Sequence, residues 1–134
     1  MRIILFPFIA LCFLSCSSHS EIKKQLSGSD SLVVQFNIPG TDTIENILTA
    51  TDRNAINELI GFIDAKRSAG TNCHYDGNLM FYKKGELSGD VSFNYTGTEC
   101  RQFIAMINGK PVITTMSKKA AEFLSSLKEG KNFY

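Results

Sequence analysis

In Leu87-Ser88-Gly89-Asp90-Val91-Ser92-Phe93-Asn94-Tyr95, apolar residues or glycine alternate without exception with polar residues. Successive side chains of a β-strand point to opposite faces, so a period of two predicts a strand with one buried face and one face in water. Such a strand needs partners on both sides, and the neighbouring sequence supplies them.

A β-hairpin is predicted on each side of this strand. Leu79–Tyr82 precedes it and is joined to it through the turn Lys83-Lys84-Gly85. After it come Phe103–Ile107 and Val112–Met116, which flank Asn108-Gly109. Asn-Gly between two apolar runs is the strongest short hairpin signal, because both residues tolerate the positive φ of a type I′ turn.

Residues 99–105 also fit a second interpretation. Phe103, Ile104 and Ile107 satisfy helical spacing, which would make this segment a helix that ends at Asn108-Gly109. We favour the strand, because Pro111 and the β-rich run after it need a pairing partner.

The rest of the chain predicts two further strands and two amphipathic helices. The strands are Leu32–Ile38 and Thr43–Ala50, joined by a Pro39-Gly40 turn. The first helix begins at the N-cap Asp52, carries Lys66-Arg67 toward its negative end and stops at Gly70; the second begins at Ser117 and ends near Gly130. Their apolar stripes are Ile56, Leu59, Ile60 and Ile63 in the first, and Ala120, Phe123, Leu124 and Leu127 in the second. The predicted fold class is α+β, an antiparallel β-sheet of about five to six strands with two amphipathic helices packed on one face.

The first sixteen residues have the composition of an export signal. Arg2 precedes an apolar run from Ile3 to Leu14, which is followed by Ser15-Cys16 and then by polar residues. As a helix the apolar run would cover about 18 Å, against about 30 Å for the hydrocarbon core of a bilayer, so a retained membrane-spanning helix is disfavoured.

This arrangement resembles a bacterial lipoprotein signal peptide, in which the cysteine after the apolar run is lipid-modified and becomes the first residue of the mature chain. The resemblance implies that residues 1–15 are removed and that Cys16 anchors the protein to a membrane of the cell envelope. Ser17 after the cysteine favours the outer membrane, by resemblance to enterobacterial sorting, with the domain in the periplasm or at the cell surface. The alternative is an ordinary secretory signal that is cut after Ser17 or Ser20.

Composition limits how the chain beyond the signal can be organised. Residues 16–31 are polar and without a period, which predicts a flexible lipid-anchored tether, and residues 32–134 are enough for a single α+β domain. Without Arg2, 13 Lys and Arg balance 13 Asp and Glu. The basic residues occur as dispersed doublets, so no nucleic-acid partner is predicted.

Cys73 and Cys100 are the two cysteines beyond the signal, 27 residues apart. In an oxidising compartment this pair predicts a disulfide, which in the chain-entropy model stabilises the fold by at most about 3.5 kcal/mol. A redox-active pair is typically more closely spaced, as in C-x-x-C.

No catalytic motif is present: G-x-S-x-G, H-E-x-x-H, a phosphate loop and a dinucleotide fingerprint are all missing from the sequence. We therefore expect a noncatalytic binding or accessory module that needs no cofactor and takes a protein, glycan or small-molecule ligand. The candidate ligand contacts come from the polar cluster around Cys73 and from one strand: His74, Tyr75, Asp76, Tyr82 and Glu99.

The alternative is a small envelope enzyme or metal-binding protein centred on His74, Asp76 and Glu99. His74 and Asp76 are two residues apart, so in an extended segment they could act as a base and the group that orients it. Zinc accepts sulfur, nitrogen and oxygen ligands, but the adjacent Cys73 and His74 would face opposite ways on a strand, which disfavours a metal site.

Overall fold

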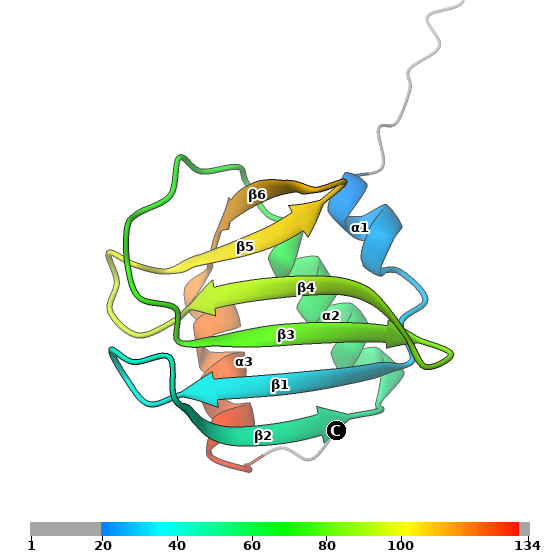
Figure 1. Cartoon of the computed structure of the whole chain (residues 1–134), viewed down its shortest axis with the longest axis horizontal. Coiled ribbons are helices and arrows are strands. Elements are labelled where there is room, and N and C mark those ends of the chain that lie inside the picture. The colour runs from blue at the N-terminus through cyan, green and yellow to red at the C-terminus, as the bar shows by residue number, and fades with distance from the viewer. Residues whose placement is uncertain (1–19, 132–134) are drawn as a thin grey trace, which may run out of the picture.

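The computed structural model describes residues 20–131, and these form three helices and one six-stranded antiparallel sheet in the order β2-β1-β3-β4-β5-β6 (Figure 1). The predicted α+β class is thereby confirmed. The strands are β1 (Ser31–Asn37), β2 (Ile44–Ala50), β3 (Gly77–Lys83), β4 (Glu86–Asn94), β5 (Gln102–Ile107) and β6 (Lys110–Thr115). The helices are α1 (Glu21–Leu26), α2 (Arg53–Ile63) and α3 (Lys118–Lys128).

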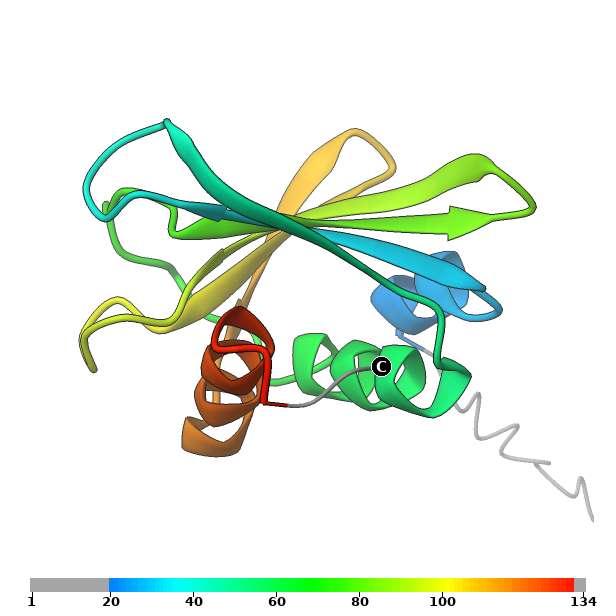
Figure 2. The ribbon, with the colours of Figure 1, turned by 90° about the horizontal axis from the view of Figure 1, so that it is seen from below.

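All three helices cover one face of the sheet, which we call the inner face; no described helix covers the opposite, outer face (Figure 2). The centre of the core is aromatic, and its largest fully buried side chains include Phe36, Phe81, Phe93 and Phe103. Burial of these rings, together with the aliphatic side chains of the core, is the main favourable term that holds helices and sheet together. No helix among residues 20–131 is long and apolar enough to cross a membrane.

Residues 102–107 form a strand, as favoured, because they pair with β4 on one side and with β6 on the other. At the β5–β6 turn Asn108 and Gly109 adopt φ values of 52° and 76°. Both values are positive, as a type I′ hairpin turn requires.

Both predicted helix starts are correct. The side chain of Asp52 accepts a hydrogen bond from the backbone N–H of Ala55, and Ser117 accepts one from Ala120. The predicted end of the first helix near Gly70 is wrong, since α2 ends at Ile63. The chain leaves the helix because residues 66–68 pair with the edge of β6, where the backbone N–H of Thr115 donates to the carbonyl of Lys66 at 2.9 Å.

Residues 16–31 were predicted to form a flexible tether, and α1 shows that this is wrong for the described part, residues 20–31. Ile22 and Leu26 lie one helical turn apart, and both are buried in the core. Leu26 packs on the backbone of Gly89, where an added Cβ would lie 2.2 Å from Leu26 Cδ2. Two apolar residues are too few to reveal a helical period, so the sequence did not show that the described domain already begins near residue 20 rather than 32. Cys16 and the signal segment lie outside the described residues.

The alternation in β4 holds only on one side of a bulge. Gly89 pairs with Phe81 but Leu87 pairs with Tyr82, which leaves Ser88 as the extra residue. The bulge turns Leu87 away from the core, so this side chain, predicted to be buried, is 56% exposed.

Candidate functional site

The loop of residues 68–76 crosses the outer face of the sheet at the end where β3 begins and β4 ends. Its Thr71 exchanges two hydrogen bonds with the side-chain amide of Gln102, at 2.9 and 3.0 Å, and the side-chain amide of Asn94 donates to the carbonyl of His74. Gln102 Nε2 also donates to Asn94 Oδ1 at 3.2 Å. Asn94, predicted to be in water, is therefore buried beneath the loop, with its polar groups paired.

A disulfide joins this loop to the β4–β5 connection. The Sγ atoms of Cys73 and Cys100 are bonded, and the two Cα atoms are 6.1 Å apart. The loop is thus held both covalently and by the hydrogen bonds beneath it, so the residues around it have fixed positions.

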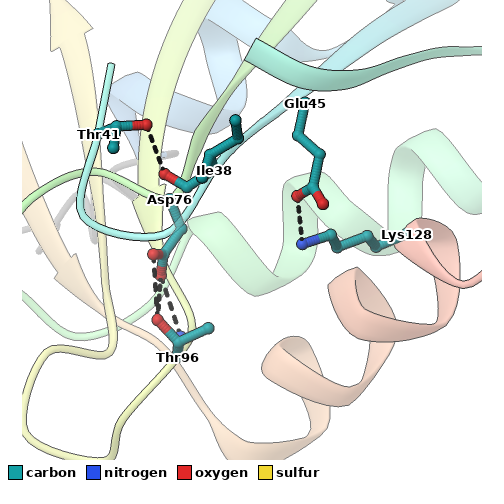
Figure 3. Close-up of polar contacts among 6 residues, drawn as sticks. All are labelled: Ile38, Thr41, Glu45, Asp76, Thr96 and Lys128. Atoms are coloured by element: carbon teal, nitrogen blue, oxygen red, sulfur yellow. Dashed lines mark hydrogen bonds and ion pairs between the residues drawn. The ribbon is translucent and has the colours of Figure 1, made fainter. Parts of the chain in front are cut away.

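Asp76 ends the loop and is only 9% exposed. Its carboxylate accepts a hydrogen bond from the backbone N–H of Tyr95 at 2.8 Å. It also accepts from the backbone N–H of Thr96, at 3.0 Å, and from the Thr96 hydroxyl (Figure 3). Carboxylates that accept from backbone N–H groups make strong, charge-assisted bonds. Asp76 therefore holds the β4–β5 connection in place.

The structure does not bring the predicted site residues together. The side chains of His74 and Glu99 are exposed and make no polar contact within residues 20–131, and the Asp76 carboxylate is occupied by Tyr95 and Thr96. In the same part of the chain no three His, Cys, Asp or Glu side chains are grouped so that they could hold a metal ion. Tyr82 lies at the opposite end of β3, half-buried, with its hydroxyl 4.0 Å from Met80 Sδ.

Tyr75, in contrast, lines a cleft of about 340 Å³ on the outer face, which we call the outer cleft. The floor of the outer cleft is a row of side chains from three adjacent strands, because Gln35 on β1 pairs with Asn78 on β3, and Asn78 pairs with Ser92 on β4. Its walls come from the β1–β2 hairpin and from the loop that ends at Asp76, and consist of Asn37, Asp42, Ile44 and Tyr75.

Much of the hydrogen-bonding capacity of the outer cleft is unused within the described chain. Ser92 donates to Asn78 Oδ1 at 3.0 Å, and Asn37 Nδ2 donates to the carbonyl of Tyr75 at 3.3 Å. The Asn78 NH₂ group and the side chains of Gln35 and Asp42 have no partner among residues 20–131. Tyr75 is 44% exposed beside them, so the cleft presents both polar groups and an aromatic ring.

Contacts behind the cleft fix the hairpin that walls it. The Thr41 hydroxyl donates to the carbonyl of Ile38 at 2.8 Å and closes the β1–β2 turn next to Asp42 (Figure 3). On β2, the Glu45 carboxylate is 2.9 Å from Lys128 Nζ at the end of α3.

The hydrogen bond with Glu45 is the main cause that raises the pKa of Lys128. Burial is the main cause that raises the pKa of the nearby Tyr95.

Most residues of the outer cleft were missed from the sequence. Gln35 and Asn37 alternate with the core residues Val34 and Phe36, and this signal places them on the outer face. Their neighbours on that face depend on strand order and register, which the sequence pattern does not contain.

Comparison with known proteins found no similarity on which function could be argued. No family model, no curated protein and no solved structure matches this chain. Function must therefore be inferred from the chemistry of the residues that the fold brings together.

Proposed function

We propose that this protein is a lipid-anchored, noncatalytic binding module of the bacterial cell envelope, anchored through Cys16, whose outer cleft takes a neutral, hydroxyl-rich ligand such as an envelope glycan. The observation that carries the proposal is the aligned row Gln35, Asn78 and Ser92 beside the exposed ring of Tyr75. The alternative of an enzyme or metal-binding protein centred on His74, Asp76 and Glu99 has no comparable support.

The lining of the outer cleft matches hydroxyl groups in two ways. Side-chain amides both donate and accept hydrogen bonds, as sugar hydroxyls do, and an exposed aromatic ring offers a flat apolar surface to the C–H face of a sugar. Asp42 is the one charged residue among those that line the cleft, and it repels anions. At about 340 Å³ the cleft lies near the lower end of the range for small-molecule sites, which suits one or two sugar units.

The place of α1 supports an anchor at the opposite end of the domain from the outer cleft. Gln25 on α1 donates to the carbonyls of Ser88, near the start of β4, and Met106, near the end of β5, whereas the cleft contains Ser92 near the end of β4 (Figure 1). Four residues from Cys16 to Ser20 span at most about 14 Å. A lipid on Cys16 would therefore hold the α1 end near the membrane and leave the cleft facing away from it.

Two further features support export. The segment that ends at Cys16 resembles a lipoprotein signal, and the Cys73–Cys100 disulfide is of a kind that persists in oxidising compartments.

The intact mass of the protein from its native membrane fraction tests the anchor. We expect loss of residues 1–15 and added acyl mass on Cys16; an unacylated chain that is cut elsewhere would refute the anchor.

Binding of the purified full-length protein in detergent to an array of neutral and acidic oligosaccharides tests the ligand. We expect selective binding of neutral glycans, lost in Tyr75→Ala. Tyr82→Ala is the matched control, because Tyr82 is a half-buried tyrosine of β3 that does not line the cleft. Absence of glycan binding, or equal losses in the two variants, would contradict the proposal.

A further inference from the structure

A second cleft, of about 240 Å³, lies between the β4–β5 connection and α3, and we call it the arginine cleft. Its lining residues are Tyr95, Thr96, Arg101, Lys118, Ala121, Glu122 and Ser125. We propose that the arginine cleft binds a small ligand that carries one carboxylate group, such as an amino acid or a sugar acid, through the guanidinium of Arg101.

Arg101 is the observation that points to a ligand. Its Nε is buried without a hydrogen-bond partner, and its guanidinium makes no ion pair within residues 20–131. A guanidinium carries five N–H donors and keeps its charge at all physiological pH values, so it is costly to leave unpaired when it is partly removed from water. An acceptor that enters the cleft would remove this cost.

The backbone holds Arg101 in place. Arg101 follows Cys100 of the disulfide and precedes Gln102, the first residue of β5. Its carbonyl accepts from the backbone N–H of Met116 at 3.4 Å. Because the backbone at Arg101 is already fixed, ligand binding requires no further ordering of the chain there, which favours affinity.

The charges around Arg101 favour a carboxylate over a phosphate dianion. Lys118 adds a second cation, but its Nζ lies 4.0 Å from a carboxylate oxygen of Glu122, so the lining carries one net positive charge. The planar guanidinium binds a carboxylate through two parallel hydrogen bonds. Glu122 would repel the second charge of a phosphate.

The volume limits the rest of the ligand. About 240 Å³ lies below the usual range for drug-sized molecules, so one amino acid or one sugar unit is the expected size. The arginine cleft shares no lining residue with the outer cleft. The proposal is therefore independent of the function proposed for the outer cleft and can fail or succeed without it.

Isothermal titration calorimetry of the purified full-length protein in detergent tests the proposal. The probes are N-acetylalanine and glucuronic acid, each compared with its uncharged counterpart, N-acetylalaninamide or glucose, and with inorganic phosphate. We expect at least one carboxylate to bind more tightly than both its counterpart and phosphate. The loss of a charged hydrogen-bond pair predicts that Arg101→Gln weakens this binding by about 10- to 100-fold.

Two variants separate binding from folding. Arg53→Gln changes an exposed arginine at the start of α2 and should leave carboxylate binding unchanged. Arg101→Lys keeps the positive charge but loses the planar guanidinium that makes two parallel hydrogen bonds, so this variant should bind the carboxylate with intermediate affinity. Neither Arg101 variant should lower the free energy of unfolding, since the side chain has no partner among the described residues. The proposal is overturned if no carboxylate binds, or if phosphate or the uncharged counterparts bind as tightly as the carboxylates. It is also overturned if Arg53→Gln weakens carboxylate binding as much as Arg101→Gln does.

Discussion

Replacement of Asp76 by alanine should destabilise the domain far more than replacement of any other acidic residue near the outer cleft. The carboxylate accepts from three donors, the backbone N–H groups of Tyr95 and Thr96 and the Thr96 hydroxyl. A hydrogen bond to a charged group contributes about 1.5 to 3 kcal/mol, and the exposure of the donor residues, with Tyr95 half-buried and Thr96 exposed, places each bond at the low end of that range. Three such bonds contribute about 4.5 kcal/mol, and after allowance for water that reaches the freed donors Asp76→Ala should cost about 3 to 4 kcal/mol.

Urea denaturation of the oxidised protein, followed by circular dichroism, measures this cost. A natural domain of this kind is stable by about 5 to 15 kcal/mol, so the midpoint should fall strongly while the slope with urea stays constant. Thr96→Ala removes only the hydroxyl donor and should cost about 1 kcal/mol. Asp42→Ala is the matched control, because Asp42 is exposed and has no partner within residues 20–131; it should change stability by less than about 0.5 kcal/mol.

The same variants test the assignment of roles. If Asp76→Ala costs less than about 1 kcal/mol, the carboxylate does not satisfy buried donors, and Asp76 would again be available as a catalytic or ligand-binding group. If Asp42→Ala is the more destabilising variant, the description of the outer cleft as a surface with unused hydrogen-bonding groups is wrong.

Leu26→Ala should destabilise the domain by about 2 to 5 kcal/mol, because it leaves a cavity in the core next to Gly89. Lys24→Ala changes an exposed residue of the same helix and should alter stability by less than about 0.5 kcal/mol. If thermal melts show equal, small effects for the two variants, the segment before β1 is a flexible tether after all. Reduction of the Cys73–Cys100 disulfide opens a loop with a sequence separation of 27, which predicts a loss of up to about 3.5 kcal/mol, and calorimetry should show a melting temperature lower by up to about 15 °C. Burial raises the pKa of Asp90, so its ionised form is less favourable in the folded than in the unfolded chain. Asp90→Asn should therefore raise stability at pH 7 by urea titration, and the gain should vanish below about pH 3.9, where the unfolded chain also binds the proton; a gain that persists in acid would refute this cause.

The positions of the strands and helices could be predicted from the local sequence pattern, because each element is recognised by which nearby side chains lie on the same face. The alternation in β4, the Asn108-Gly109 turn and the caps at Asp52 and Ser117 are signals that need no distant partner. The same logic failed for α1, where the helix is stabilised by Leu26 packing on Gly89, a residue 63 positions further along the chain. It also failed for Leu87, because a bulge is a property of a strand pair.

The candidate sites divide in the same way. The chain alone sufficed to predict the pairing of Cys73 with Cys100 and to direct attention to Tyr75, since these residues are rare or stand in a dense polar cluster. Asp76 belonged to that cluster as well, but only the folded chain shows that its carboxylate already accepts a hydrogen bond from Thr96. Both clefts are made of residues that are distant in sequence and become neighbours through strand register and the packing of α3. Side-chain periodicity is a local property, whereas a binding site depends on which distant groups meet and which remain unpaired, and that is decided by tertiary contacts.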